Sequence, residues 1–168
     1  MWHRQAQLGG GARTGTTDMK DIAQQIRSIL ATVEPQLLRM DPDQTGLKTD
    51  PNKWSKREIL GHLIDSAANN HQRFVRAAYH AAMEFPPYDP NEWVRVQRYN
   101  EAPWPLLVAL WSAYNHHLCR VIECIPAEAE SFPCNIGKEE PVPLQFVIED
   151  YLRHLRHHLN KILPEEQI

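Results

Sequence analysis

The sequence has no hydrophobic run long enough to cross a membrane and no surplus of positive charge. A membrane-spanning helix needs roughly 18 or more apolar residues in succession, and no segment of this chain reaches that length. The 18 Lys and Arg residues are outnumbered by 21 Asp and Glu residues, which gives a formal net charge of −3. Proteins that bind nucleic acid without regard to sequence normally carry a basic surplus. We therefore expect neither a membrane protein nor a nucleic-acid-binding protein.

Cysteine is also scarce. The three cysteines, Cys119, Cys124 and Cys134, form no C-x-x-C pair, and an odd number argues against a disulfide framework. This usage favours a reducing compartment, so we expect a cytoplasmic protein. We expect Cys119 and Cys124 to pack as small apolar side chains rather than to bind a metal.

The N-terminal 17 residues lack the apolar core that a signal peptide requires, and they contain three successive glycines at 9–11. We interpret residues 1–17 as a flexible leader and residues 18–168 as one domain. Apolar residues make up 42% of the chain and charged residues 23%, which is typical of a soluble globular protein.

Four segments carry apolar residues at spacings of three and four, which predicts amphipathic helices over about 18–38, 55–83, 103–125 and 144–163. The second begins with Ser55 and Glu58, the spacing of a capping box. Pro103 and Pro105 suit the first turn of the third. No segment alternates convincingly with period two. Amphipathic helices of this length need one another to bury their apolar faces, so we expect an all-α four-helix bundle.

The connections between the second and third helices and between the third and fourth are longer than a minimal bundle needs. The first of them, from about 84 to 101, contains several aromatic residues. We interpret its segment 86–99 as a candidate cover for a substrate pocket.

The histidines give the clearest functional signal. His154 and His158 are four residues apart on the last predicted helix, so they share a face and can bind one metal. Such a pair alone is equally compatible with two surface or half-buried imidazoles. His62, at the edge of the apolar stripe of the second helix, supplies a third candidate ligand. A divalent transition metal that is held by three imidazoles and keeps its other coordination positions open is typical of a catalytic site.

Gly61, beside His62, costs its helix roughly 1 kcal/mol relative to alanine, which a close approach to the backbone would explain. Of the adjacent His116 and His117, at most one can face inward. The remaining histidines are expected to be structural, exposed or part of the leader: His3, His71, His80 and His157.

Two segments, Trp54–Asp65 and Tyr151–Ile162, resemble the DinB superfamily, especially its YfiT-like branch. That family has a tryptophan before the second helix, a histidine about eight residues later and H-x-x-x-H in the last helix. Trp54, His62, His154 and His158 occupy these positions, and the resemblance extends over about residues 18–163. It implies a four-helix bundle, a metal held by the three histidines, commonly zinc or nickel, and frequently a homodimer. Family members include bacillithiol or mycothiol S-transferases and a mycothiol-dependent maleylpyruvate isomerase.

A metal at such a site lowers the pKa of bound water or thiol, so we expect a hydrolase or a thiol-dependent S-transferase acting on a small-molecule electrophile. Asp65 and Asp150, about one turn from His62 and His154, are candidates to orient the imidazoles. Salt bridges with nearby arginines are their alternative role. Tyr151 is a candidate to hydrogen-bond substrate, with core packing as the alternative. The rival function is a non-catalytic metal-binding bundle that serves stability or partner contact.

Overall fold

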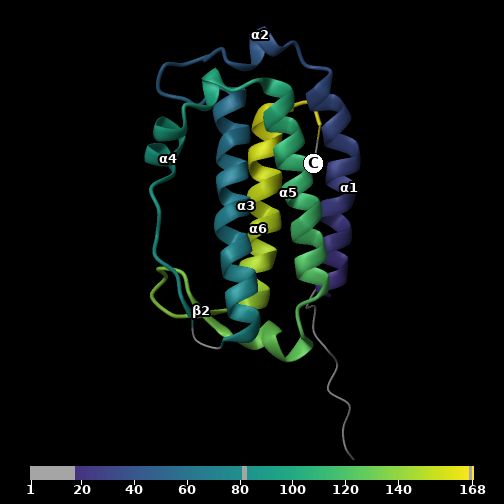
Figure 1. Ribbon diagram of the computed structural model, residues 1–168, viewed down its shortest axis with the longest axis vertical. Helices are drawn as coiled ribbons and strands as arrows, with labels where there is room; N and C mark the ends of the chain where they lie inside the picture. The colour runs from purple at the N-terminus through teal and green to yellow at the C-terminus, as the bar shows by residue number, and fades with distance from the viewer. Residues whose placement is uncertain (1–17, 81–82, 167) are drawn as a thin grey trace, which may run out of the picture.

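The computed structural model describes residues 18–80, 83–166 and 168. Its four long helices are α1 (Met19–Leu38), α3 (Lys56–Tyr79), α5 (Trp104–Glu123) and α6 (Leu144–Ile162). They form a four-helix bundle, which confirms the predicted fold (Figure 1). The predicted leader, residues 1–17, lies outside the described residues together with His3.

The order and direction of the helices explain why one connection is long. The closest packing is between α1 and α5, between α5 and α3, and between α3 and α6. In Figure 1, α3 and α5 run in the same direction, opposite to α1 and α6. The chain between α3 and α5 must therefore return along the whole length of the bundle, as crossover connections in helical bundles do.

The start of α3 follows the predicted capping box. The backbone N–H of Ser55 donates to Glu58 Oε2 at 2.8 Å, and the backbone N–H of Glu58 donates to Ser55 Oγ at 3.2 Å. The helix ends at Tyr79, earlier than predicted, because the backbone of His80 is extended, with φ −140° and ψ 105°.

The connections contain short elements that the sequence patterns do not predict. The region 84–101, expected to be a loop, includes α4 (Pro90–Gln97) and the 3₁₀ helix η1 (Tyr99–Glu101). Asp89 caps α4 by accepting the backbone N–H of Asn91 at 2.8 Å. The other short elements are α2 (Pro42–Thr45), η2 (Ala127–Ser131), β1 (Met83–Glu84), β2 (Pro133–Asn135) and β3 (Val142–Pro143). β2 pairs with β1 in parallel and with β3 antiparallel. Strands this short carry no detectable alternation.

The core lies between the four long helices and contains large buried side chains, including Phe74, Trp104 and Trp111. Cys119 is buried, as expected, but Cys124 is exposed at the end of α5, so the packing role predicted for it is wrong. Among the described residues, no helix combines the length and the apolar character needed to cross a membrane.

Candidate metal centre

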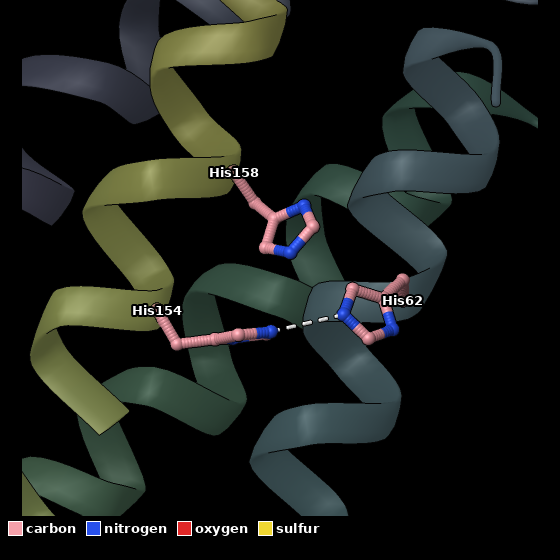
Figure 2. Close-up of side chains that lie close together, drawn as sticks. All are labelled: His62, His154 and His158. Atoms are coloured by element: carbon pink, nitrogen blue, oxygen red, sulfur yellow. Dashed lines mark hydrogen bonds between the residues drawn. The ribbon is translucent and has the colours of Figure 1, made fainter. Parts of the chain in front are cut away.

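Three histidines meet in the seam between α3 and α6. His62 comes from α3, and His154 and His158 come from successive turns of α6 (Figure 2). One ring nitrogen from each lies within 4.8 Å of the others. The Nε2 atoms of His62 and His154 are 3.0 Å apart, at hydrogen-bonding distance. The structure therefore brings together the three residues that the sequence singles out as ligands.

Burial keeps these imidazoles neutral. His62 and His158 are buried, and His154 is partly buried. Burial, reinforced by repulsion from His154, lowers the pKa of His62 to about 4 and that of His158 to about 3. Burial also lowers the pKa of His154, although Asp150 opposes that shift. Neutral imidazole is the form that coordinates a metal, so the site offers ligands that need not lose a proton first at neutral pH.

The donor atoms fit a divalent transition metal. Two nitrogens bound to one tetrahedral zinc ion at about 2.0–2.1 Å lie roughly 3.3 Å apart. The separation of 3.0 Å between His62 and His154 is close to that value. All three donor atoms lie within 4.8 Å of one another, so one ion between them would draw the more distant nitrogens closer together. Three imidazoles suit zinc, nickel, iron and copper alike, so the donor set fits the class of metal without selecting one.

A hydroxyl, not a carboxylate, lies next to the far nitrogen of His154. Ser66 Oγ is 3.4 Å from His154 Nδ1, and it also accepts a hydrogen bond from Asn70 Nδ2 at 3.3 Å. If Nε2 of His154 held a metal, the ring proton would be on Nδ1, where it would be donated to Ser66. Ser66 was not among the predicted site residues. Its position four residues after His62, on the same helix face, is the signal that could have identified it.

The two predicted carboxylates have other partners. Asp150 pairs with Arg153 at 2.8 Å, the alternative role considered for it. Asp65 is buried and accepts hydrogen bonds from the hydroxyl of Tyr99 at 2.6 Å and from Gln97 Nε2 at 2.7 Å. Burial raises the pKa of Asp65, and these two donors partly counteract the rise. Within the described residues, neither carboxylate is hydrogen-bonded to a ligand imidazole.

Tyr151 is part of the core. Its side chain is buried, and its hydroxyl donates to Asn115 Oδ1 at 2.6 Å. The ring also packs edge-on against Phe74, with centroids 5.8 Å apart. Burial raises the pKa of the Tyr151 hydroxyl, which therefore stays protonated. These contacts correspond to the core-packing alternative.

Gly61 is required by the ring of Tyr99. A Cβ added at Gly61 would overlap three ring carbons of Tyr99, far inside van der Waals contact. The close approach that the glycine led us to expect is thus made by the end of the crossover segment. The hydroxyl of Tyr99 then reaches Asp65, one turn beyond His62. The crossover is held against α3 beside the imidazoles.

Trp54 forms a wall of the site. Its ring centroid lies 4.8 Å from that of His62 and 6.3 Å from that of His158. Trp54 also lines a groove of about 580 Å³, a size suited to a small molecule. The other lining residues come from the segment before α3, from α3 itself, from α4 and from the end of α6: Thr49, Asn52, Lys53, Ile59, Asn91 and Lys161.

The remaining histidines do not join the site. His116 and His117 are both exposed on α5. His71 lies on the second half of α3, with Nδ1 3.2 Å from the Tyr114 hydroxyl and its ring 5.0 Å from that of His117. His157 is exposed, as expected, and His80 is also exposed.

Comparison with known proteins agrees with the four-helix bundle. YfiT from Bacillus subtilis, described as a probable metal-dependent hydrolase with an unusual four-helix bundle topology, is 18% identical with a TM-score of 0.77. The match covers 93% of this chain and 90% of YfiT. A mycothiol-dependent maleylpyruvate isomerase is 14% identical with a TM-score of 0.69, over 85% of this chain and 60% of the isomerase. At these identities the similarity shows the fold alone.

No curated protein matches this sequence. The family model of the DinB superfamily matches residues 22–162, which include all of the helical bundle except the first three residues of α1. The chain belongs to the DinB superfamily.

Proposed function

We propose that this protein is a metal-dependent enzyme that activates water or a small thiol for attack on a small electrophile. The observation that carries this proposal is the convergence of three buried or partly buried, neutral imidazoles from two helices, His62, His154 and His158. Three protein ligands leave a coordination position free for a reactant, as in catalytic rather than structural zinc sites.

The bound ion, zinc or nickel in our proposal, would act as a Lewis acid that lowers the pKa of a water or a thiol toward neutrality. The protein's own residues would hold the ion and orient its ligands. The three imidazoles would hold the ion, and Ser66 would orient the ring of His154 through Nδ1. Trp54 shields His62 from water on one side.

The groove beside Trp54 is the proposed place for the body of the substrate. Asn91 of α4 lines it together with Lys53 and Lys161, so the crossover segment contributes directly to its wall. This position supports the role of segment 86–99 as a cover. An Asn91→Ala variant should raise KM while metal content stays unchanged. The reverse pattern, metal loss with unchanged KM, would contradict the cover role.

Both hydrolysis and thiol transfer are compatible with this arrangement. The structural neighbours include a probable metal-dependent hydrolase, YfiT, and an isomerase that depends on the thiol mycothiol. The test is to load the protein with zinc or nickel and to assay small esters, amides and alkylating electrophiles. Each compound is offered with water alone and with bacillithiol, mycothiol or glutathione.

The expected result is metal-dependent turnover that falls at least about 100-fold in His154→Ala. The matched control is His116→Ala, because His116 is exposed on α5, away from the cluster. Turnover that persists in His154→Ala, or metal-loaded protein that turns over none of these compounds, would favour the non-catalytic metal-binding bundle instead.

A further inference from the structure

Building on the proposed function, we propose that Arg73 forms a second binding position at the same site, one that holds a carboxylate group of the substrate. Arg73 lies on α3, beyond Ser66 as seen from His62. It lines a cavity that extends along the seam between α3 and α6 as far as His154.

The size of this cavity restricts what it can hold. It has a volume of about 120 Å³, and its walls include Ser66, Asn70, Tyr88 and His154 as well as Arg73. One water molecule occupies about 30 Å³ of liquid. The cavity therefore has room for a group of a few heavy atoms, such as a carboxylate, and not for a whole substrate, which the larger groove beside Trp54 can take.

Arg73 forms no direct ion pair within the described residues, although Asp150 is near enough to oppose the lowering of its pKa. Its only hydrogen bond there is a long one, 3.5 Å, from Nη1 to Asn70 Oδ1. The side chain is partly buried, and burial is the main influence on its pKa, which it lowers. A desolvated cation without a partner is unfavourable, and an anion in the cavity would relieve that cost. The planar guanidinium matches a carboxylate with two parallel N–H···O bonds.

The other groups around the cavity leave this charge available. Asp150 also lines the cavity, but its carboxylate is engaged by Arg153 at 2.8 Å. Burial raises the pKa of Tyr88, so its hydroxyl stays neutral and able to donate. Asn70 and Ser66 are neutral as well. The cavity thus presents the Arg73 cation among neutral hydrogen-bonding groups and one carboxylate, that of Asp150, which is paired with Arg153 and also attracts Arg73 at longer range.

The cavity connects Arg73 to the metal centre. Arg73 follows Ser66 by seven residues, about 10 Å along the helix axis, and helical side chains lean back toward the N-terminus. The contact between Arg73 and Asn70 follows that direction. A carboxylate on Arg73 would therefore lie a few bonds from an electrophilic carbon beside His154. The geometry points to short electrophiles that carry a carboxylate.

The test uses acetate as the probe and acetamide, its neutral counterpart of the same shape, as the control. Both are titrated at constant ionic strength into isotope-labelled wild-type protein, and the Nε–Hε signal of Arg73 and the ring signals of His154 are followed by NMR. We expect saturable shifts with acetate and none with acetamide. Affinity for acetate should fall about tenfold or more in Arg73→Gln, less in Arg73→Lys, and not in Arg76→Gln, an exposed arginine on the same helix.

Equal binding of acetate and acetamide in the wild type would overturn the proposal, whatever the stability of the variants. Unchanged acetate affinity in a folded Arg73→Gln protein that retains its metal would also overturn it, because the carboxylate would then bind the metal itself. The two proposals fail separately. Protein that binds acetate through Arg73 but no metal refutes the metal enzyme alone, and protein that binds metal but no acetate refutes the carboxylate position alone.

Discussion

The two halves of α3 are buried very differently, although they belong to one continuous helix. Every residue from Ile59 to Ala67 is buried, whereas in residues 68–79 burial is confined to Asn70, Phe74 and Ala77. A helix on the outside of a bundle buries one stripe of residues three and four apart. The second half follows that rule. The first half is enclosed on all sides, by α5, by α6 and by the crossover segment with Tyr99.

The enclosed half contains the polar residues that an ordinary bundle helix would expose. His62, Asp65 and Ser66 are all buried there. Buried polar groups are unfavourable unless they have partners, and two of these have them, Asp65 in Tyr99 and Ser66 in Asn70. His62 keeps a buried Nδ1 without a partner in the described residues, while its Nε2 faces His154. Complete enclosure of a polar helix segment therefore coincides with the candidate metal centre of this bundle.

Among substitutions that test the enclosure of the first half of α3, Gly61→Ala is expected to change stability most. The new Cβ forces the ring of Tyr99 away from α3. Overpacking typically costs 1–3 kcal/mol, and this overlap with three ring carbons belongs at the upper end of that range, about 3 kcal/mol; the gain in helix propensity, about 1 kcal/mol, offsets part of it. We expect a net loss of about 2 kcal/mol in the free energy of unfolding, measured by urea denaturation. In a Tyr99→Leu background the same change should become neutral or stabilising. An equal loss in both backgrounds would show that Tyr99 is not the obstacle.

A somewhat smaller effect is expected from Tyr99→Phe, which removes a hydrogen bond to the buried carboxylate of Asp65. The expected loss of stability is about 1.5 kcal/mol at a pH above the pKa of Asp65, where its carboxylate is charged. Because burial raises the pKa of Asp65 and the bond favours its charged form, the loss should shrink as pH falls below that raised pKa. Tyr79→Phe, at an exposed position in the other half, is the control. A loss that does not change with pH would contradict the role of the charged carboxylate.

Ser66→Ala should change metal binding more than folding. The hydroxyl of Ser66 contacts Nδ1 of His154, and loss of such a partner typically weakens metal affinity by 10- to 100-fold. We expect about a tenfold loss of affinity, measured by competition with a chelating dye, with the helical circular dichroism unchanged. Ser28→Ala, on the exposed face of α1, should leave affinity as it is. Equal affinities in the two variants would remove Ser66 from the site.

The smallest effect is expected in the second half of α3. His71→Ala removes a contact of 3.2 Å with Tyr114 near the surface, so stability should change by no more than about 0.5 kcal/mol. Metal content should not change at all. A metal loss in this variant would show that the metal-binding residues of α3 are not confined to its first half.

The sequence predicts the long helices and the meeting of the histidines because both depend on local spacing. Ser55 and Glu58 are three residues apart, and His154 and His158 are four apart, so helix geometry places each pair together. The position of His62 opposite them follows from its place at the edge of an apolar stripe, which has to face another helix.

The contacts across the crossover depend on distant residues and are not visible in the pattern. The hydroxyl of Tyr99 donates a hydrogen bond to Asp65, 34 residues away in the sequence, and that of Tyr151 donates to Asn115, 36 residues away. Helix α4 is too short to show periodicity, and its signal, Asp89-Pro90, is the signal of a turn as well as of a helix start. The carboxylates Asp65 and Asp150 have the right spacing from the histidines. Spacing alone does not show that the hydroxyl of Ser66, and not a carboxylate, lies beside Nδ1 of His154.

The most direct test of the account is the metal content of the purified, tag-free protein. It is measured by elemental analysis after incubation with zinc or nickel, for the wild type and for alanine variants at His62, His154 and His158, with His71→Ala and His116→Ala as controls. We predict about one metal ion per chain in the wild type and both controls, and loss of the ion in each ligand variant while the helical signal survives. A wild type that holds no metal, or ligand variants that hold as much as the controls, would contradict the three-histidine centre.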